Sequence, residues 1–152
     1  MITLVRTDSD NPDFRALVAL LDQELRDRDG EEHAFFAQFN KLDKIRHVVL
    51  AFQDNKPAGC GAFKEYSPDI AEVKRMFVHP DFRRSGIAAA ILSELEIWAK
   101  EAGFSTCILE TGIRQPEAIN LYHKMSYRDI PNYGQYNGVE SSVCMEKNLS
   151  KP

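Results

Sequence analysis

The stretch VHPDFRRSGIAAAIL, residues 78–92, places two arginines, a serine and a glycine directly before a predicted helix. The first backbone N–H groups of a helix lack partners and the macrodipole is positive there, so phosphate binds readily at such a point. Arg83 and Arg84 add positive charge, and Gly86 allows the backbone to come close to a bulky ligand. Together these residues predict a diphosphate-binding turn.

The turn lacks the patterns of two other phosphate-binding loops. It has neither the GxGxxG of dinucleotide-binding folds nor the GKS or GKT of the Walker loop. It matches RxxGxA at residues 83–88, directly after a predicted strand that ends MFVHP. In a second segment, EAINLYHKMSY at residues 117–127, a tyrosine follows a leucine and a lysine comes two residues later. With these two motifs the chain resembles the GNAT superfamily of N-acetyltransferases.

The resemblance extends from the first predicted strand to VCMEK and is strongest between Glu72 and Tyr127. One departure is Ser126, which stands where the family commonly has glycine. The resemblance implies an α/β fold whose central mixed, mostly antiparallel sheet has about six to seven strands, with one splayed parallel pair and about four flanking helices. Residues 1–152 are expected to form a single GNAT-like acetyltransferase domain.

The resemblance also implies that acetyl-CoA, a thioester of coenzyme A, is the donor co-substrate. Its pyrophosphate is expected on the backbone amides of Arg84–Ala89, and its pantetheine arm along the edge of the strand Met76–Val78. Asn120 is expected to bond the pantetheine arm by analogy alone. The expected cofactor-binding residues are Met76, Phe77, Val78, Arg83, Arg84, Ser85, Gly86, Ile87, Ala88, Ala89 and Asn120.

Acetyl transfer to an amine requires that the amine attack as its neutral form. A lysine-like amine with a pKa of about 10.4 lies about 3.4 units from neutrality at pH 7, so deprotonation costs about 4.6 kcal/mol. A general base lowers this barrier. Glu72, at the start of the strand expected to bind the donor, is the leading candidate, acting directly or through water. Glu65 and Glu110 each end a strand and are alternatives, and a solvated charge is the other interpretation of Glu72.

Tyr122 is the second candidate catalytic residue. It shares the apolar face of a predicted helix with Leu121 and Met125, so its ring points inward and its hydroxyl needs a partner. The resemblance implies that this hydroxyl bonds the departing CoA sulfur, whereas a core tyrosine bonded to a backbone carbonyl is the alternative. No cysteine has a histidine beside it, and direct attack on the thioester requires no covalent enzyme intermediate.

The elements that must position these residues follow from periodicity and turn signals. An N-cap at Asn11 with Pro12 at the first helical position opens a helix that DRDG ends. A strand, a helix and a second strand between residues 71 and 110 form a βαβ unit, whose two strands are parallel. Strands are predicted at ITLVRT, HVVLAFQ, AGCGAFKEY, AEVKRMFV, FSTCILE, YRDI and VCMEKNL, and the turn-forming DNKP between HVVLAFQ and AGCGAFKEY predicts that these two form an antiparallel hairpin. Further helices are predicted at EEHAFFAQF, after RRSG up to Gly103, and from Pro116.

Composition limits the class of protein. The chain has 152 residues, a net charge of −4 and 43% hydrophobic residues, which favours one globular domain and gives no general attraction to nucleic acid or to an anionic membrane. The three cysteines are predicted to be buried free thiols, and a cytoplasmic location is expected. The four histidines show no metal-ligand spacing, so no metal is expected.

The predicted function is transfer of an acetyl group from acetyl-CoA to a primary amine of a small molecule or an amino-acid-like compound. A peptide or protein amine is one alternative, and a non-catalytic acyl-CoA sensor is another. Tyr133 and Tyr136 lie in the loop IPNYGQYNG, where they either line the acceptor pocket or hold the loop against the core. A homodimer is an open expectation, because GNAT-like domains often pair.

Overall fold

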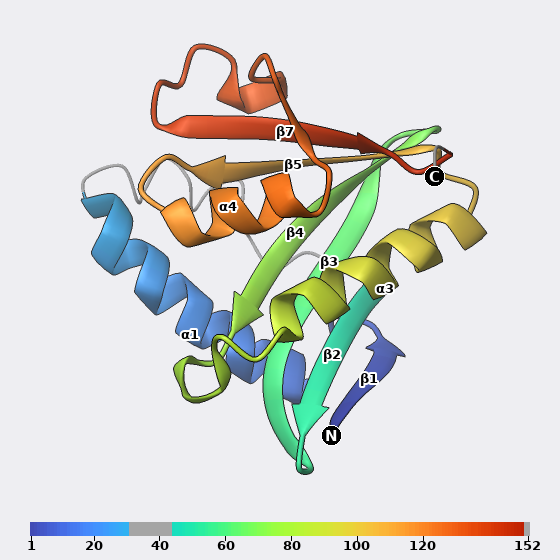
Figure 1. Cartoon of the computed structure of the whole chain (residues 1–152), viewed down its shortest axis with the longest axis vertical. Coiled ribbons are helices and arrows are strands. Elements are labelled where there is room, and N and C mark those ends of the chain that lie inside the picture. Colours follow the sequence, from blue (N-terminus) through green and yellow to red (C-terminus); the bar gives the residue numbers. More distant parts are fainter. Residues whose placement is uncertain (31–43, 151–152) are drawn as a thin grey trace. The chain divides into compact units, whose positions relative to one another are not determined.

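The computed structural model describes residues 1–30 and 44–150 and contains one seven-stranded sheet in the order β1-β2-β3-β4-β5-β7-β6 (Figure 1). The strands are β1 Ile2–Thr7, β2 His47–Gln53, β3 Lys56–Ser67, β4 Ile70–Val78, β5 Thr106–Gly112, β6 Arg128–Ile130 and β7 Ser142–Asn148. The helices of the described residues are α1 Pro12–Asp29, α3 Ile87–Glu101 and α4 Pro116–Lys124, with short 3₁₀ turns η2 Pro80–Phe82 and η3 Gly134–Tyr136. The pair β4–β5 is parallel, as the predicted βαβ unit requires.

The described chain forms two compact units. Unit 1 comprises Met1–Phe63 and Arg75–Leu95, and unit 2 comprises Lys64–Lys74 and Glu96–Pro152, in each case as far as they are described. Strands β3 and β4 each contribute residues to both units, because the boundaries fall within them. Each unit therefore holds part of the predicted functional residues.

In unit 1, α1 begins where the sequence predicts. The Asn11 side-chain oxygen accepts hydrogen bonds from the backbone N–H groups of Asp13 and Phe14 at 2.8 and 3.3 Å, and Pro12 occupies the first helical position. Gly30 caps the other end with a φ of 56°. The apolar side of α1 packs on one face of the strands and forms the core with them, through Phe14, Leu17, Val18, Leu21, Ile45, Val48, Leu50, Cys60, Ala62 and Phe77.

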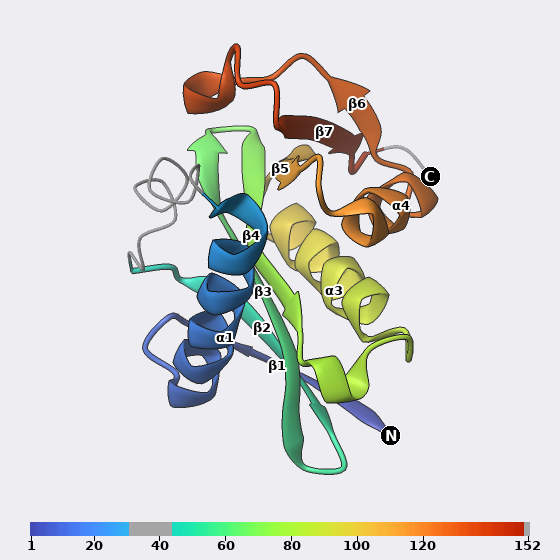
Figure 2. The ribbon, with the colours of Figure 1, turned by 90° about the vertical axis from the view of Figure 1, so that its left-hand side faces the viewer.

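The other face of the unit 1 strands is covered by the first half of α3, so the two helices lie on opposite sides of the sheet (Figure 2). Gly61 of β3 makes this close approach possible. A Cβ at Gly61 would lie 2.6 Å from the Met76 sulfur and within 3.0 Å of the Ile91 and Leu95 side chains of α3. Alternation along β3 thus sends its small glycines toward α3 and its apolar side chains toward α1.

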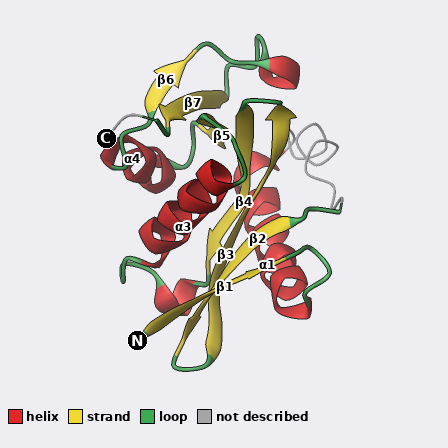
Figure 3. Cartoon of the chain, turned by 90° about the vertical axis from the view of Figure 1, so that its right-hand side faces the viewer, coloured by secondary structure: helices red, strands yellow, loops and turns green. Residues whose placement is uncertain are grey.

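The hairpin of β2 and β3 also belongs to unit 1 (Figure 3). Its loop consists of Asp54 and Asn55, both with positive φ, at 52° and 68°. Two consecutive positive φ values are typical of a type I′ turn, whose twist matches that of the flanking strands. The predicted antiparallel hairpin is confirmed.

Unit 2 contains the antiparallel pairs β5–β7 and β6–β7, and helix α4. After α4 the backbone turns sharply at Ser126, whose φ is 74°, and the Tyr127 amide bonds the Tyr122 carbonyl at 2.9 Å. A polar network then ties α3 to β7: Glu96 accepts hydrogen bonds from the Tyr127 hydroxyl at 3.0 Å and from the Lys147 ammonium at 2.8 Å. The chain leaves α4 through Ser126, a position whose backbone conformation favours glycine.

The predicted α/β fold, with a mixed, mostly antiparallel sheet and one parallel pair, is confirmed. The three helices of the described residues compare with about four expected, and the predicted helix EEHAFFAQF lies outside those residues. None of the helices described is both long and apolar enough to cross a lipid bilayer.

Candidate active site

The donor turn, which we define as residues 83–89, leads from η2 into α3 in unit 1. Arg84 and Gly86 both have positive φ, at 66° and 81°, and the Ser85 hydroxyl donates a hydrogen bond to the Phe82 carbonyl. No acidic residue occupies the first turn of α3, so no side-chain carboxylate of that turn competes for its N-terminal amides. The start of α3 thus has backbone amides of the kind that can bind an anion.

Gly86 is suited to this turn for two physical reasons. Its φ lies in the left-handed region, which L side chains rarely adopt. A Cβ placed on Gly86 would meet nothing within 4 Å, so the space beside its backbone is open within the described residues. The fit between the turn and a diphosphate therefore rests on accessible backbone, and the assignment of the cofactor-binding residues stays a prediction.

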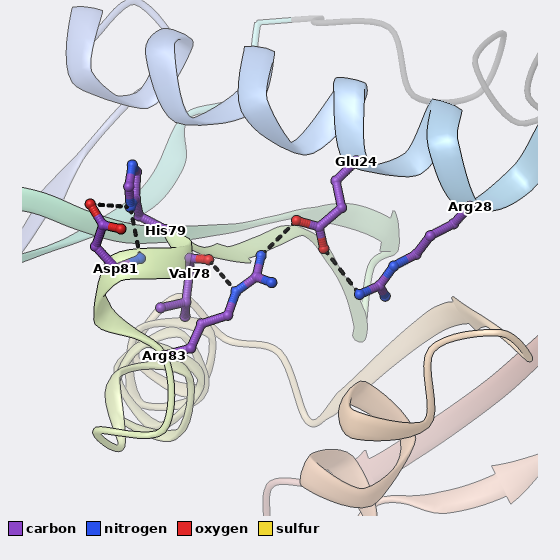
Figure 4. A network of polar contacts seen from close by, with 6 residues as sticks. All are labelled: Glu24, Arg28, Val78, His79, Asp81 and Arg83. Carbon is purple, nitrogen blue, oxygen red and sulfur yellow. Dashed lines mark hydrogen bonds and ion pairs between the residues drawn. The ribbon is translucent and has the colours of Figure 1, made fainter.

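Arg83 has bonding partners on α1 and at the end of β4 (Figure 4). Its Nη2 bonds the Glu24 carboxylate of α1 at 2.6 Å, and its Nε donates to the Val78 carbonyl at 2.9 Å. Arg28 shares the same carboxylate at 3.2 Å. The Arg83 guanidinium thus joins α1 to the end of β4, and its charge is partly neutralised by Glu24.

Arg84 contrasts with its neighbour. Its side chain is exposed and makes no ion pair or hydrogen bond with any residue of the described ranges 1–30 and 44–150. Of the two adjacent arginines, Arg84 is therefore the one with an uncompensated charge beside the helix terminus. The sequence gives no reason to distinguish them, because Glu24 lies 59 residues from Arg83 in the chain.

The end of β4, where the pantetheine arm is expected, contains an irregularity that the sequence does not predict. Arg75, directly before Met76, has a φ of 61° although it lies within the strand. Its side chain is buried and pairs with Asp22 of α1 at 3.2 Å, and its carbonyl accepts a hydrogen bond from the Cys60 thiol at 3.3 Å. The only available signal was a charged pair, KR, inside the apolar run AEVKRMFV.

Glu72 lies on β4 in unit 2, and only 4% of its surface is exposed. Its Oε2 accepts a hydrogen bond from the Tyr133 hydroxyl at 2.7 Å, and its Oε1 lies 3.9 Å from the Lys74 ammonium. The interpretation of Glu72 as a solvated charge is therefore wrong. Of the two alternative bases, Glu65 is exposed and Glu110 accepts a hydrogen bond from the Ser142 hydroxyl at 2.7 Å.

Tyr122 is buried on α4, with 6% of its surface exposed, and its ring packs edge-on against Tyr127 at 5.9 Å. Its hydroxyl makes no hydrogen bond within the described part of the chain, so the alternative of a core tyrosine bonded to a backbone carbonyl has no support there. Burial, and then the Glu110 carboxylate, raise the pKa of Tyr122 above its usual value. Its hydroxyl therefore remains a donor. Asn120 is exposed on the same helix.

The three cysteines are free and buried, as predicted. Burial raises the pKa of Cys60 and Cys107 to about 12 and that of Cys144 to about 11. All three thiols are therefore protonated at neutral pH and are poor nucleophiles. Among the described residues no group of three or more His, Cys, Asp and Glu side chains is arranged to hold a metal ion.

Comparison with known proteins agrees with the fold and identifies the family. The sequence profile of the acetyltransferase (GNAT) family matches residues 10–127. A relative from Azospirillum brasilense named IAA acetyltransferase is 36% identical over 136 residues, which cover 88% of each chain. A crystal structure from Klebsiella pneumoniae, assigned as an acyl-CoA N-acyltransferase, is 27% identical with a TM-score of 0.82 over 98% of both chains.

A more distant structure shares the same fold. The PaiA N-acetyltransferase of Thermoplasma acidophilum, solved in complex with coenzyme A, has a TM-score of 0.72 at 17% identity over 97% of this chain and 99% of that chain. A mixed sheet with one parallel βαβ unit, together with these matches, defines a transferase of acyl groups. The chain belongs to the GNAT family of acetyltransferases. It is an acetyl-CoA-dependent acyltransferase.

Proposed function

We propose that the chain moves the acetyl group of acetyl-CoA to a primary amine of a small molecule or amino-acid-like compound, by direct attack while both substrates are bound. In this reaction the amine nitrogen forms a bond to the thioester carbonyl carbon, the carbon–sulfur bond breaks, and the amine loses a proton. The chain must therefore bind the donor, accept one proton and stabilise the departing sulfur. The 152 residues are proposed to act as a single catalytic domain.

The observation that carries this proposal is the burial of Glu72 on the strand whose end is expected to hold the donor. A carboxylate that is buried and hydrogen-bonded has a fixed orientation, which a solvated surface glutamate lacks. Glu72 lies four positions before Met76 in β4, so one strand carries both the proposed base and the first of the expected donor-binding residues. In this reaction Glu72 takes the proton of the attacking amine, directly or through one water.

The donor is proposed to bind through backbone groups of unit 1. The amides of Arg84–Ala89 at the start of α3 would hold the pyrophosphate, and the exposed Arg84 side chain would add its charge. Met76–Val78 would pair with the pantetheine arm as an added strand does. The structure of a protein with this fold in complex with coenzyme A supports this choice of donor.

The thiols and Tyr122 support direct transfer over a covalent acetyl-enzyme. Every cysteine of the chain has a raised pKa, so no thiolate is available to accept the acetyl group at neutral pH. The buried Tyr122 hydroxyl, which makes no hydrogen bond within the described residues, is free to donate one to the departing CoA sulfur. Because its pKa is raised, it stabilises the thiolate as a donor rather than by giving up its proton.

Initial-velocity kinetics of CoA release, with acetyl-CoA and the acceptor both varied, test the proposal. The acceptor panel contains alkylamines, amino acids, an N-terminal peptide amine and IAA, the last because a relative is named for it. We expect turnover with a small amine and intersecting double-reciprocal lines. Parallel lines would point to an acetyl-enzyme. Turnover with the peptide alone would mean that the acceptor is a peptide or protein amine. Acetyl-CoA binding without acceptor-dependent CoA release across the whole panel would favour a sensor.

A further inference from the structure

The contact between Tyr133 and Glu72 joins two segments that lie 61 residues apart in the chain. Tyr133 belongs to the segment between β6 and β7, and its hydroxyl donates to Oε2 of Glu72 at 2.7 Å. Both residues belong to unit 2. A hydrogen bond to a buried carboxylate is charge-assisted, so it is stronger than one between neutral groups and fixes the orientation of the acceptor.

We propose that Tyr133 is a positioning residue, which holds the Glu72 carboxylate turned so that Oε1 is the oxygen that receives the amine proton. The inference rests on the proposed function, in which Glu72 is the base. With Oε2 bonded to Tyr133, Oε1 is the oxygen left for proton transfer, because the Lys74 ammonium lies 3.9 Å from it, beyond hydrogen-bond distance.

Tyr133 is itself held in place. Its ring packs edge-on against Tyr66 at 5.2 Å and against Tyr136 at 5.7 Å, and Tyr136 is only 2% exposed. The neighbouring Asn132 side chain donates to the carbonyls of Val139 and Ser142 at 2.8 and 3.1 Å, which closes the segment onto the start of β7. The hydroxyl of Tyr133 therefore has a defined position from which to orient the carboxylate.

The charge state of Tyr133 makes it a permanent donor. Burial, and then the negative charge of Glu72, raise the pKa of Tyr133 well above the usual value of a phenol. The phenol consequently keeps its proton throughout the range in which a carboxylate ionises. A hydrogen bond from the phenol to a carboxylate is charge-assisted and stronger than one to a neutral acid, so loss of the hydroxyl removes more stabilisation from the anion than from the acid.

Among the described residues, Tyr136 between β6 and β7 and Cys144 of β7 are two ionisable side chains that interact with the charges of Glu72 and of Glu110 on β5. Burial raises the pKa of Tyr136 above its usual value and that of Cys144 to about 11, so both remain neutral at acidic pH. The Nζ atom of Lys74 on β4 lies 3.9 Å from Oε1 of Glu72. The Glu110→Gln variant separates the effect of Glu72 from that of Glu110, whose charge also acts on Tyr136 and Cys144.

The test compares Tyr133→Phe with Tyr66→Phe. Both remove one hydroxyl from the same ring cluster, but the hydrogen bond to Glu72 comes from Tyr133. In Tyr133→Phe we expect kcat to fall about fivefold to tenfold with KM unchanged, and the acid limb of the kcat/KM profile to move up by about one pH unit. A 3-fluorotyrosine at position 133 is a stronger donor of the same shape, and it should move the limb to lower pH. Tyr66→Phe and Glu110→Gln should leave the limb in place.

A carboxyl ¹³C titration of Glu72, assigned with Glu72→Gln, separates this inference from the function on which it rests. If Glu72→Gln keeps full activity, Glu72 is not the base and the proposed function loses its base, although the midpoint can still depend on Tyr133. If Glu72→Gln is inactive and the ¹³C midpoint and acid limb are the same with tyrosine, phenylalanine or fluorotyrosine at position 133, the inference is wrong. The fluorotyrosine protein keeps the test open should Tyr133→Phe fold poorly.

Discussion

The donor turn of unit 1 and the carboxylate cluster of unit 2, by which we mean Glu72, Lys74, Tyr133 and Tyr136, place their chemistry in different parts of the chain. The donor turn relies on backbone amides and on the positive φ of Gly86, all within seven consecutive residues. The carboxylate cluster relies on side chains from two distant segments. Substitutions should therefore affect donor binding in the first region and proton transfer in the second.

The largest expected effect on donor binding follows Gly86→Glu. A glutamate would place negative charge and bulk at the proposed anion site, so acetyl-CoA affinity should fall by at least about 100-fold, as isothermal titration calorimetry can measure. Gly138→Glu is a matched control, because Gly138 has a φ of 80° against 81° for Gly86, and neither has a neighbour within 4 Å of an added Cβ. Unchanged affinity in Gly86→Glu, or equal losses in both variants, would remove the donor from this turn.

Tyr122→Phe should change turnover more than binding. Without the hydroxyl the departing sulfur loses one hydrogen bond, so kcat should fall about tenfold while acetyl-CoA affinity stays within twofold. Tyr127→Phe is the control, because its hydroxyl bonds Glu96 and its loss should lower the free energy of unfolding by about 1 kcal/mol and leave kcat unchanged. Full activity of Tyr122→Phe would make Tyr122 a packing residue.

The two arginines of the donor turn should differ in how their substitution changes acetyl-CoA affinity and its dependence on salt concentration. Arg84→Ala removes an uncompensated charge, so acetyl-CoA affinity at low salt should fall about threefold to fivefold and depend less on ionic strength. Arg83→Ala removes the ties to Glu24 and Val78, so it should mainly lower stability, by about 0.5–1 kcal/mol for a partly exposed pair. If Arg83→Ala weakens binding more than Arg84→Ala, the assignment of the charge is reversed.

The smallest effect is expected at Ser126, outside both regions. Its φ of 74° is unfavourable for serine and ordinary for glycine, so Ser126→Gly should raise the free energy of unfolding by about 0.5–1 kcal/mol. Urea denaturation measures the change, and kcat/KM should be unaltered. A decrease in stability would mean that the conformational entropy that glycine loses on folding outweighs the relief of backbone strain.

Local signals explain what the sequence predicts correctly. The N-cap and proline at Asn11 and Pro12 start α1, and the pair Asp54 and Asn55 supplies the hairpin turn, because each structure needs only the residues at that point. The local structure of residues 83–89 also depends on adjacent residues, a strand end, a glycine and a helix start, whereas the binding of the donor there stays a prediction. The family resemblance adds the identity of the donor to this local pattern.

Contacts between distant segments explain what the sequence does not predict. The bond from Tyr133 to Glu72 spans 61 residues and the pair of Arg83 with Glu24 spans 59, so neither leaves a periodic or adjacent pattern. Arg75, which has a positive φ within β4, pairs with Asp22, 53 residues away. Burial of Glu72 was missed for the same reason: its partners come from elsewhere in the fold.

The central claim, that donor binding and proton transfer depend on separate residues, is tested most directly by Glu72→Gln. The substitution keeps the size of the side chain and its ability to accept a hydrogen bond from Tyr133, but removes the base. With kcat measured alongside, the account predicts an acetyl-CoA Kd within twofold of the unsubstituted protein and a kcat lowered by at least about 100-fold. A Kd weakened as much as kcat, or an unchanged kcat, would contradict it.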